Sequence, residues 1–207
     1  MTGFDRRRHW QGVYSAKAET ELSWFQATPA PSLDLLRLAG ADKESALIDI
    51  GGGASVLVDH LLAEGVRDLT VLDLSQAALD RTRARLGAVG AAVAWIAGDA
   101  TEWTPPKTYD VWHDRAAFHF LTEAADRAAY MERLRRALRV GGAAIFGAFA
   151  LDGPEKCSGL PVMRHDAASL AAELGPGFEL LDHRRHDHRT PGGATQKYQF
   201  STFRRAA

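Results

Sequence analysis

The stretch Ala46-Leu47-Ile48-Asp49-Ile50-Gly51-Gly52-Gly53-Ala54-Ser55 decides how this chain folds. Its first half is a short apolar run of the kind that forms a buried strand in a parallel sheet. Three consecutive glycines follow, and apolar residues then recur at helical spacing, so a helix is predicted to begin near Ser55. A strand, a glycine turn and a helix form the start of a βαβ unit, in which glycine lets a ligand approach the backbone closely.

The second predicted strand carries a carboxylate near its end. Residues 69–74 form another apolar run, and Asp73 stands about 24 positions after Asp49. In nucleotide-binding βαβ units an acid that binds the ribose stands roughly 20 residues further along the chain. The glycine turn alone is a weak signal, but together with Asp73 it favours a site for a nucleotide-like ligand.

From residue 45 onwards, apolar strands and amphipathic helices alternate regularly. This alternation predicts a parallel, doubly wound sheet with right-handed crossovers. Gly141 and Gly142 are expected to end the last long helix and to start the fifth strand. Residues 178–189 and 196–205 are typical of two strands joined by a turn, which adds an antiparallel hairpin. The earlier strands are expected at 46–50, 69–74, 93–97, 109–114 and 143–150, and the helices at 55–64, 76–86, 123–138 and 166–174.

Length and composition limit the class of protein. The 207 residues suit one α/β domain, and the net charge of -1 argues against a nucleic-acid or anionic-membrane partner. The triplet Arg6-Arg7-Arg8 is expected on a solvated face. The single cysteine, Cys157, fits a reducing compartment. Neither a signal peptide nor an apolar run long enough to span a bilayer is seen, so the expected location is cytoplasmic. The oligomeric state stays open.

Residues 1–44 precede the regular alternation. Helices are expected around 6–17 and 32–39, and aromatic residues are dense in this part of the chain: Trp10, Tyr14, Trp24 and Phe25. Two interpretations stay open, a lid over the ligand and a helix docked on the sheet. The chain is therefore divided into an N-terminal helical and aromatic lid segment, 1–44, and a ligand-binding part, 45–207, within a single domain overall.

These residues resemble the class I S-adenosylmethionine-dependent methyltransferases across most of the chain. The family's first motif, an acid and then glycines alternating with other residues, is matched from Asp49 to Ser55. The match departs from the motif at Ser55, where many members have a further glycine. The resemblance implies an α/β, Rossmann-like three-layer sandwich whose seven-stranded, mostly parallel sheet has a C-terminal antiparallel hairpin. It also implies that residues 45–207 bind S-adenosyl-L-methionine and that the chain is an enzyme of this class.

The resemblance further implies which residues contact the cofactor. Asp49 and the three glycines would lie against its methionine part, and Asp73 would accept both ribose hydroxyls. Asp99, in Gly98-Asp99-Ala100, would accept the adenine amine. All three acids fall at carboxyl ends of predicted strands, where such sheets bind ligands. The expected cofactor contacts are Asp49, Gly51, Gly52, Gly53, Asp73, Leu74, Asp99, Ala100, Asp114 and Trp24.

A hydride-transferring dehydrogenase is an alternative, because its nucleotide-binding unit also has a strand, a glycine turn, a helix and an acid at the end of the second strand. Two observations count against it. The three-glycine turn lacks the G-x-G-x-x-G spacing, and no second, substrate-binding domain follows.

The acceptor side is predicted from the end of the fourth strand, where Asp114-Arg115 is followed by an aromatic residue and His119. This arrangement resembles the small thiol and thiopurine methyltransferases, which implies a small acceptor with a thiol or other heteroatom nucleophile. Protein lysine methyltransferases of the elongation-factor type share a comparable tryptophan-led N-terminus, so a protein lysine is the alternative acceptor. A cofactor-binding partner subunit without catalysis is the second alternative.

Methyl transfer from a sulfonium requires alignment and, where the nucleophile carries a proton, a base. The candidate catalytic residues are therefore His119, Arg115 and Asp114. His119 is either the base or a residue of the cavity wall. Arg115 either binds an anionic group of the acceptor or pairs with Asp114.

Two further features are interpreted without a catalytic role. Cys157 lies in the loop after the fifth strand, and methyl transfer needs no covalent intermediate. His183, His186 and His188 are close in sequence, but in a strand the first points away from the other two. No metal site is therefore expected.

Overall fold

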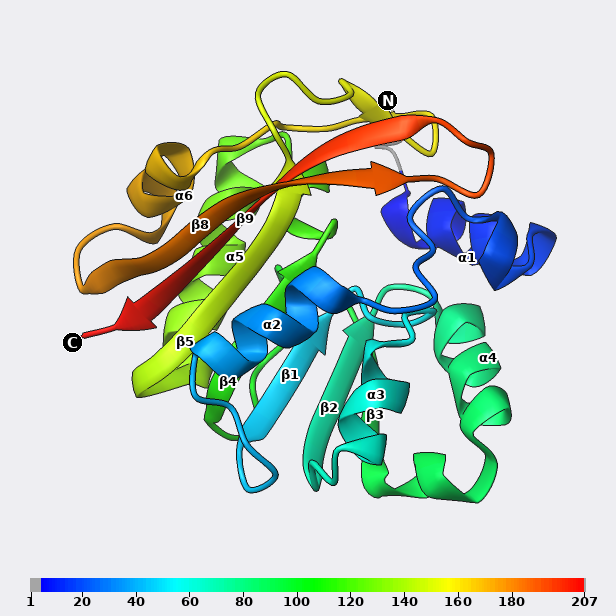
Figure 1. Ribbon diagram of the computed structural model, residues 1–207, viewed down its shortest axis with the longest axis horizontal. Coiled ribbons are helices and arrows are strands. Elements are labelled where there is room, and N and C mark those ends of the chain that lie inside the picture. Colours follow the sequence, from blue (N-terminus) through cyan, green and yellow to red (C-terminus); the bar gives the residue numbers. More distant parts are fainter. Residues whose placement is uncertain (1–4, 207) are drawn as a thin grey trace.

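The computed structural model describes residues 5–206, and its core is one seven-stranded sheet with helices on both faces (Figure 1). The strand order is β3-β2-β1-β4-β5-β9-β8. The first five strands run parallel, and β9 is antiparallel to both β5 and β8. The predicted fold class is thereby confirmed. The strands are β1 (Ala46–Ile50), β2 (Asp68–Asp73), β3 (Val93–Ala97), β4 (Tyr109–Arg115), β5 (Leu138–Phe149), β8 (Phe178–Arg189) and β9 (Thr195–Arg205).

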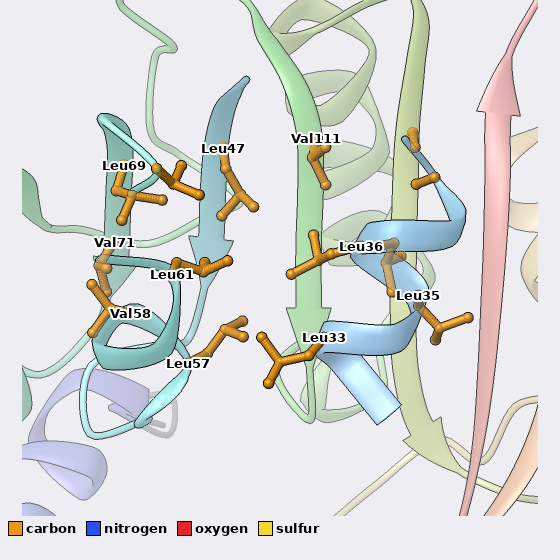
Figure 2. Close-up of a cluster of buried hydrophobic side chains, with 14 of the residues drawn as sticks. Leu33, Leu35, Leu36, Leu47, Leu57, Val58, Leu61, Leu69, Val71 and Val111 are labelled. Atoms are coloured by element: carbon orange, nitrogen blue, oxygen red, sulfur yellow. The ribbon is translucent and has the colours of Figure 1, made fainter. Parts of the chain in front are cut away.

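The helices form the outer layers of the sandwich. They are α1 (Arg6–Ala16), α2 (Ala30–Leu38), α3 (Leu57–Ala63), α4 (Gln76–Leu86), α5 (Ala124–Ala137) and α6 (Ala167–Leu174). Figure 2 shows leucine and valine side chains of α2 and α3 lying against one face of β1, β2 and β4. Side chains of α5 and α6 pack on the opposite face with Ile48 and Trp112. Leu47 and Ile48 point to opposite faces and both are buried, so β1 is covered on both of its faces.

The junction between α5 and β5 differs from the prediction. We expected Gly141 and Gly142 to end the helix, but α5 already ends at Ala137 and β5 begins at Leu138. The glycines instead lie inside the strand, where the β4–β5 register shifts. Gly141 has a φ of +79°, and a Cβ on Gly142 would lie 2.9 Å from the backbone oxygen of Asp110. Both positions therefore require glycine for an irregular strand, not for a helix end.

The strand order creates a ligand-binding crevice at the carboxyl ends of the central strands. β1 lies between β2 and β4, so the chain leaves β1 in one direction and returns on its other side, and a crevice forms at the carboxyl ends of these strands. In Figure 1, α1 lies beyond the arrowheads of β1 and β2. A smaller two-stranded sheet, β6 (Lys156–Cys157) with β7 (Leu160–Pro161), follows β5. In residues 5–206, no helix has the length and apolar character needed to cross a membrane.

Candidate functional site

A pocket opens at the carboxyl ends of β1, β2 and β4. Its space amounts to about 990 Å³, including the part open to solvent. Three of the predicted site residues, Gly53, Asp114 and His119, are not part of its lining. The others do line it: Trp24, Asp49, Gly51, Gly52, Asp73, Leu74, Asp99, Ala100 and Arg115.

The glycine turn after β1 is shaped by the two acids around it. Gly51 has a φ of +69°, which favours glycine, and its N–H donates to the Leu72 carbonyl at 2.7 Å. A Cβ on Gly52 would fall 2.2 Å from Asp49 Oδ2, and one on Gly53 would fall 2.7 Å from the Asp73 carboxylate. Side chains at these two positions are therefore excluded by carboxylates, which leaves the turn open to a ligand.

Asp73 ends β2 and is fixed by backbone donors. Its Oδ2 accepts the Gly53 N–H at 3.0 Å, and its Oδ1 accepts the Ser75 N–H at 2.8 Å. Burial raises the pKa of Asp73 to about 6, and the two N–H groups act in the opposite direction. Gly53 thus supports Asp73 from behind the pocket wall. At neutral pH the carboxylate is ionised and suited to accept hydroxyl groups.

Asp49 has a partner that the sequence did not reveal. His113 Nδ1 lies 2.7 Å from Asp49 Oδ1, and His113 Nε2 lies 2.9 Å from Ser32 Oγ. All three side chains are buried, and His113 lines the pocket beside Asp49. Asp49 and His113 are neighbours because β1 pairs with β4 in that register. The local sequence around either residue does not indicate that Asp49 and His113 lie side by side.

Asp99 is tied to the N-terminal helix. Its Oδ1 accepts the Thr101 N–H at 2.8 Å and the Thr101 hydroxyl at 2.7 Å, while its Oδ2 pairs with Arg6 at 3.1 Å. Arg6 also pairs with Asp126 at 3.0 Å and lines the pocket. The prediction that Arg6 lies on a solvated face was therefore wrong, because two carboxylates draw it into the wall of the pocket.

The N-terminal segment contributes aromatic side chains to the pocket. Trp10 and Tyr14 lie four residues apart on the same face of α1, and both are buried. The Trp10 ring lies 4.8 Å from Phe120 and 5.8 Å from Trp24, measured between centroids. Trp10, Tyr14, Trp24 and Phe120 all line the pocket. Of the two interpretations of residues 1–44, α1 thus fits the lid, while α2 is docked on the sheet.

Polar contacts hold this segment in place. The Gln11 side-chain oxygen accepts from the Ser75 hydroxyl at 3.1 Å and from the Ala77 N–H at 3.2 Å. Arg81 donates to the Tyr14 carbonyl at 2.5 Å and to the Lys17 carbonyl at 2.6 Å. Helix α4 is therefore the main support on which α1 rests.

Asp114 lies behind the pocket and shapes the turn after β4. Its carboxylate accepts the N–H groups of Ala117 and Phe118 and, at 2.6 Å, the Tyr130 hydroxyl. Burial raises its pKa to about 6, and these donors oppose the rise. With its oxygens used in this way and its side chain away from the lining, Asp114 makes no contact with the pocket space.

Arg115 lines the pocket and does not pair with Asp114. Its Nη2 donates to the Trp24 carbonyl at 3.0 Å. Among residues 5–206, no carboxylate lies within ion-pair distance of its guanidinium. Two roles of Arg115 were considered from sequence, binding of an anionic group of the acceptor and pairing with Asp114. The geometry agrees with the first, because the positive charge is available to a ligand.

His119 is buried and lies outside the lining. Its ring packs 4.5 Å from Phe120 and 4.9 Å from Phe149, between centroids, and within residues 5–206 neither ring nitrogen has a hydrogen-bond partner. Burial, with repulsion from His165 and Arg115, lowers the pKa of His119 to about 3. An imidazole with this pKa is a weak base at neutral pH. The ring packs against Phe120, which lines the pocket, but does not itself reach the lining, and both interpretations of His119 stay predictions.

Cys157 and the C-terminal histidines complete the sequence candidates. Cys157 is buried and lines the pocket, and burial raises the pKa of its thiol to about 11, so it is a thiol at neutral pH. His188 Nε2 is bonded to the Ser23 carbonyl at 2.7 Å. Within the described part of the chain, no group of three or more His, Cys, Asp or Glu residues is arranged to hold a metal ion.

Comparisons with known proteins agree with this geometry. Residues 47–142 match the family model described as "Methyltransferase domain". Nodulation protein S of Rhizobium tropici is 29% identical over 113 residues, which are 55% of this chain and 46% of that protein. The match thus spans about half the length of this curated relative.

Two solved structures are similar over nearly the whole chain. The N-methyltransferase NodS from Bradyrhizobium japonicum, in complex with S-adenosyl-L-homocysteine, has a TM-score of 0.73 at 16% identity and covers 98% of this chain and 100% of its own. The 1,6-didemethyltoxoflavin-N1-methyltransferase of Burkholderia thailandensis has a TM-score of 0.70 at 20% identity and covers 97% and 84%. At these identities the similarity establishes the fold.

Proposed function

We propose that this chain, whose residues 47–142 match the methyltransferase-domain model, transfers the methyl group of S-adenosyl-L-methionine to a small nucleophilic acceptor. The match of residues 47–142 to the methyltransferase-domain model supports this class of protein, and the complex of the similar NodS structure with S-adenosyl-L-homocysteine supports the cofactor. The acceptor atom is a heteroatom, nitrogen or sulfur. NodS and the 1,6-didemethyltoxoflavin-N1-methyltransferase are both N-methyltransferases, which supports nitrogen as the acceptor atom in addition to the thiol sulfur favoured from sequence.

The pocket residues fit the cofactor. Asp49 Oδ2 is buried and has no hydrogen-bond partner among residues 5–206, so it offers an acceptor for a cationic methionine amine. Asp73 offers a carboxylate for the ribose hydroxyls, and Asp99 one for the adenine amine. The turn at Gly51 and Gly52 lets the ligand approach the backbone. Three carboxylates at neighbouring strand ends suit one adenosyl sulfonium, which carries positive charge at one end and hydroxyl and amine donors at the other.

The single observation that carries the small-acceptor assignment is the aromatic wall of the pocket. Trp10 and Tyr14 come from α1, Trp24 from the loop after it and Phe120 from the turn after β4, and all four line one cavity with the predicted cofactor contacts. A lysine of a folded protein needs an open groove through which its chain enters. Side chains converging over the pocket instead favour an acceptor that is enclosed before transfer. The same cavity argues against a non-catalytic subunit, in which the acceptor space would be filled.

When bound, the cofactor supplies a methyl group on a sulfonium, so the protein needs to align the acceptor and exclude water. Trp10, Trp24 and Phe120 provide the apolar wall for both tasks. Burial raises the pKa of Tyr14 well above its usual value and that of Cys157 to about 11, so both keep their protons at neutral pH and neither acts as a base. We infer that the acceptor attacks in its nucleophilic form and that any proton leaves to solvent. Arg115 is the proposed contact for an anionic group of the acceptor.

The N-terminal segment 1–44 is proposed as the lid of this domain. The expected cytoplasmic location is kept as part of the proposal, and it rests on the single cysteine and the ordinary composition.

Calorimetry with S-adenosyl-L-homocysteine tests the cofactor part of the proposal. We expect wild type to bind and Asp73→Asn to bind at least about 100-fold more weakly, because two charge-assisted hydrogen bonds are lost. Asp80→Asn is the matched control, since Asp80 is exposed on α4 and, among the described residues, its side chain is hydrogen-bonded to Gln76 alone. Equal affinity of wild type and Asp73→Asn would refute the ribose role of Asp73.

Labelling of a cell extract tests the acceptor class. With methyl-labelled S-adenosylmethionine, the proposal expects label in the fraction that passes a small-molecule filter. Label retained on protein, released as methyl-lysine after hydrolysis, would instead support the lysine alternative. No transfer to either fraction, with cofactor binding intact, would favour the non-catalytic subunit.

A further inference from the structure

A buried hydrogen-bond chain runs from α2 through β4 to β1. Ser32 Oγ lies 2.9 Å from His113 Nε2, and His113 Nδ1 lies 2.7 Å from Asp49 Oδ1. The exposed fractions of Ser32, His113 and Asp49 are 1%, 2% and 3%. A chain of polar groups enclosed in this way is strongly bonded and has little freedom to rearrange.

The two oxygens of Asp49 are not equivalent. Oδ1 is bonded to His113, whereas Oδ2 is buried without a hydrogen-bond partner in residues 5–206. Oδ2 lies next to the glycine turn, since a Cβ on Gly52 would fall 2.2 Å from it. An unpartnered buried carboxylate oxygen is costly unless a ligand supplies a donor. Oδ2 is therefore the oxygen left for the ligand.

The geometry fixes the role of the ring. In the ionised form that the proposed contact with a cationic amine requires, Asp49 only accepts hydrogen bonds, so His113 Nδ1 carries the proton and donates to Oδ1. The Ser32 hydroxyl donates or accepts, so it suits Nε2 in either protonation state. The ring is thus held at both nitrogens, and it cannot turn without breaking both hydrogen bonds.

We propose that His113 is a positioning residue for cofactor binding, which donates Nδ1–H to Asp49 and, held by Ser32, directs Oδ2 toward the cationic methionine part of the cofactor. This inference rests on the proposed function and adds to it two residues outside the matched motif. An outer partner of this kind sets the orientation of the group that meets the ligand.

Two substitutions separate the two hydrogen bonds of the ring. In His113→Asn the amide nitrogen stands near the place of Nδ1, so a donor to Asp49 is kept and the Ser32 contact is lost. In His113→Gln the amide nitrogen stands near the place of Nε2, so the Ser32 contact is kept and the donor to Asp49 is lost. Both variants lose the packing of the ring, and each therefore controls for the other.

Three measurements are made on the full chain. Nitrogen-15 NMR of the ligand-free wild type reads which ring nitrogen of His113 carries a proton. Calorimetry with S-adenosyl-L-homocysteine gives the affinity, and thermal unfolding shows whether each variant is folded. We expect a proton on Nδ1, binding by His113→Asn within about threefold of wild type, and binding by His113→Gln about 10- to 100-fold weaker.

A proton on Nε2 alone, or an equal loss of affinity in both variants at equal thermal stability, would overturn the proposal. If a His113 variant does not fold, Ser32→Ala replaces it. Loss of the Ser32 hydroxyl is expected to move the His113 ring signals and to weaken binding, and unchanged signals and affinity would contradict the proposal. The NMR measurement needs no cofactor, so it stands even if wild type binds none. Absence of binding to wild type would count against the proposed function instead.

Discussion

Arg6 in helix α1 forms an ion pair with Asp99, with a distance of 3.1 Å between its Nη2 and the Asp99 Oδ2. The pair joins the N-terminal segment to the carboxylate that we assign to the adenine amine. Arg6 also reaches Asp126, so one side chain links α1 to two other parts of the domain. Arg6 therefore links α1 directly to Asp99 in the wall of the pocket.

Arg6→Gln is predicted to loosen α1. Because the two ion pairs are partly exposed, their loss should cost about 1 kcal/mol or less. Hydrogen exchange of the α1 amides is expected to rise, with the sheet unaffected. Arg8→Gln is the control, because Arg8 is exposed on the same helix. Identical exchange in the two variants would show that the ion pairs do not hold the segment.

The pH dependence of stability follows from Asp73. Burial raises its pKa from 3.8 to about 6, so between these values the folded protein binds the proton more tightly than the unfolded chain. Its stabilising contribution is therefore complete below about pH 4 and is lost as the pH rises through about 6, a change on the order of 2 to 3 kcal/mol. Asp73→Asn removes this contribution. Thermal unfolding from pH 4 to 7 should show a steeper fall for wild type, and parallel curves would contradict the assignment.

The Asp73 contribution to folding stability falls as the pH rises, whereas the affinity for the cofactor should increase. Ribose hydroxyls donate to the ionised form of Asp73, so the affinity for S-adenosyl-L-homocysteine is predicted to fall as the pH drops through about 6. Calorimetry at pH 5, 6, 7 and 8 measures the effect. A flat profile would mean that Asp73 is not in contact with the nucleoside.

His119→Leu is predicted to keep turnover within a few-fold of wild type. Both ring nitrogens are buried without partners, so their removal should stabilise the fold by about 1 to 2 kcal/mol. Denaturant unfolding and initial rates measure the two effects. A 100-fold loss of kcat at unchanged stability would instead restore His119 as the base.

Gly52→Ala is predicted to abolish cofactor binding. The new Cβ would overlap the Asp49 carboxylate at 2.2 Å and force either the turn or the acid to move. Gly12→Ala is the matched control, because a Cβ on Gly12 meets nothing within 4 Å. In helix α1 this control should stabilise the protein by about 0.5 to 1 kcal/mol. If Gly52→Ala still binds the cofactor, the glycine turn is not part of the binding site.

The local sequence predicted most of the fold. The positions of the glycine turn and of the acids at 49, 73 and 99 could be predicted because each stands beside its own strand end, whereas their cofactor contacts follow from the family resemblance and stay predictions. The partner of Asp49 could not, since His113 is brought to it by the β1–β4 register. Arg6 likewise reaches Asp99 from 93 positions away.

The prediction at the α5–β5 junction failed for a related reason. Gly141-Gly142 has the composition of a helix end, and only the pairing with β4 shows that these residues form an irregularity inside the strand. His119 was predicted in the site but lies outside the pocket lining. Tertiary structure decides this, because the sequence alone does not tell which residues of the turn after β4 face the pocket.

A crystal structure of the complex with S-adenosyl-L-homocysteine tests the central claim most directly. We predict the nucleoside in the pocket at the ends of β1, β2 and β3, with its ribose hydroxyls within hydrogen-bond distance of Asp73 and its adenine amine beside Asp99. A nucleoside bound elsewhere, or bound in this pocket without contact to either carboxylate, would contradict the account.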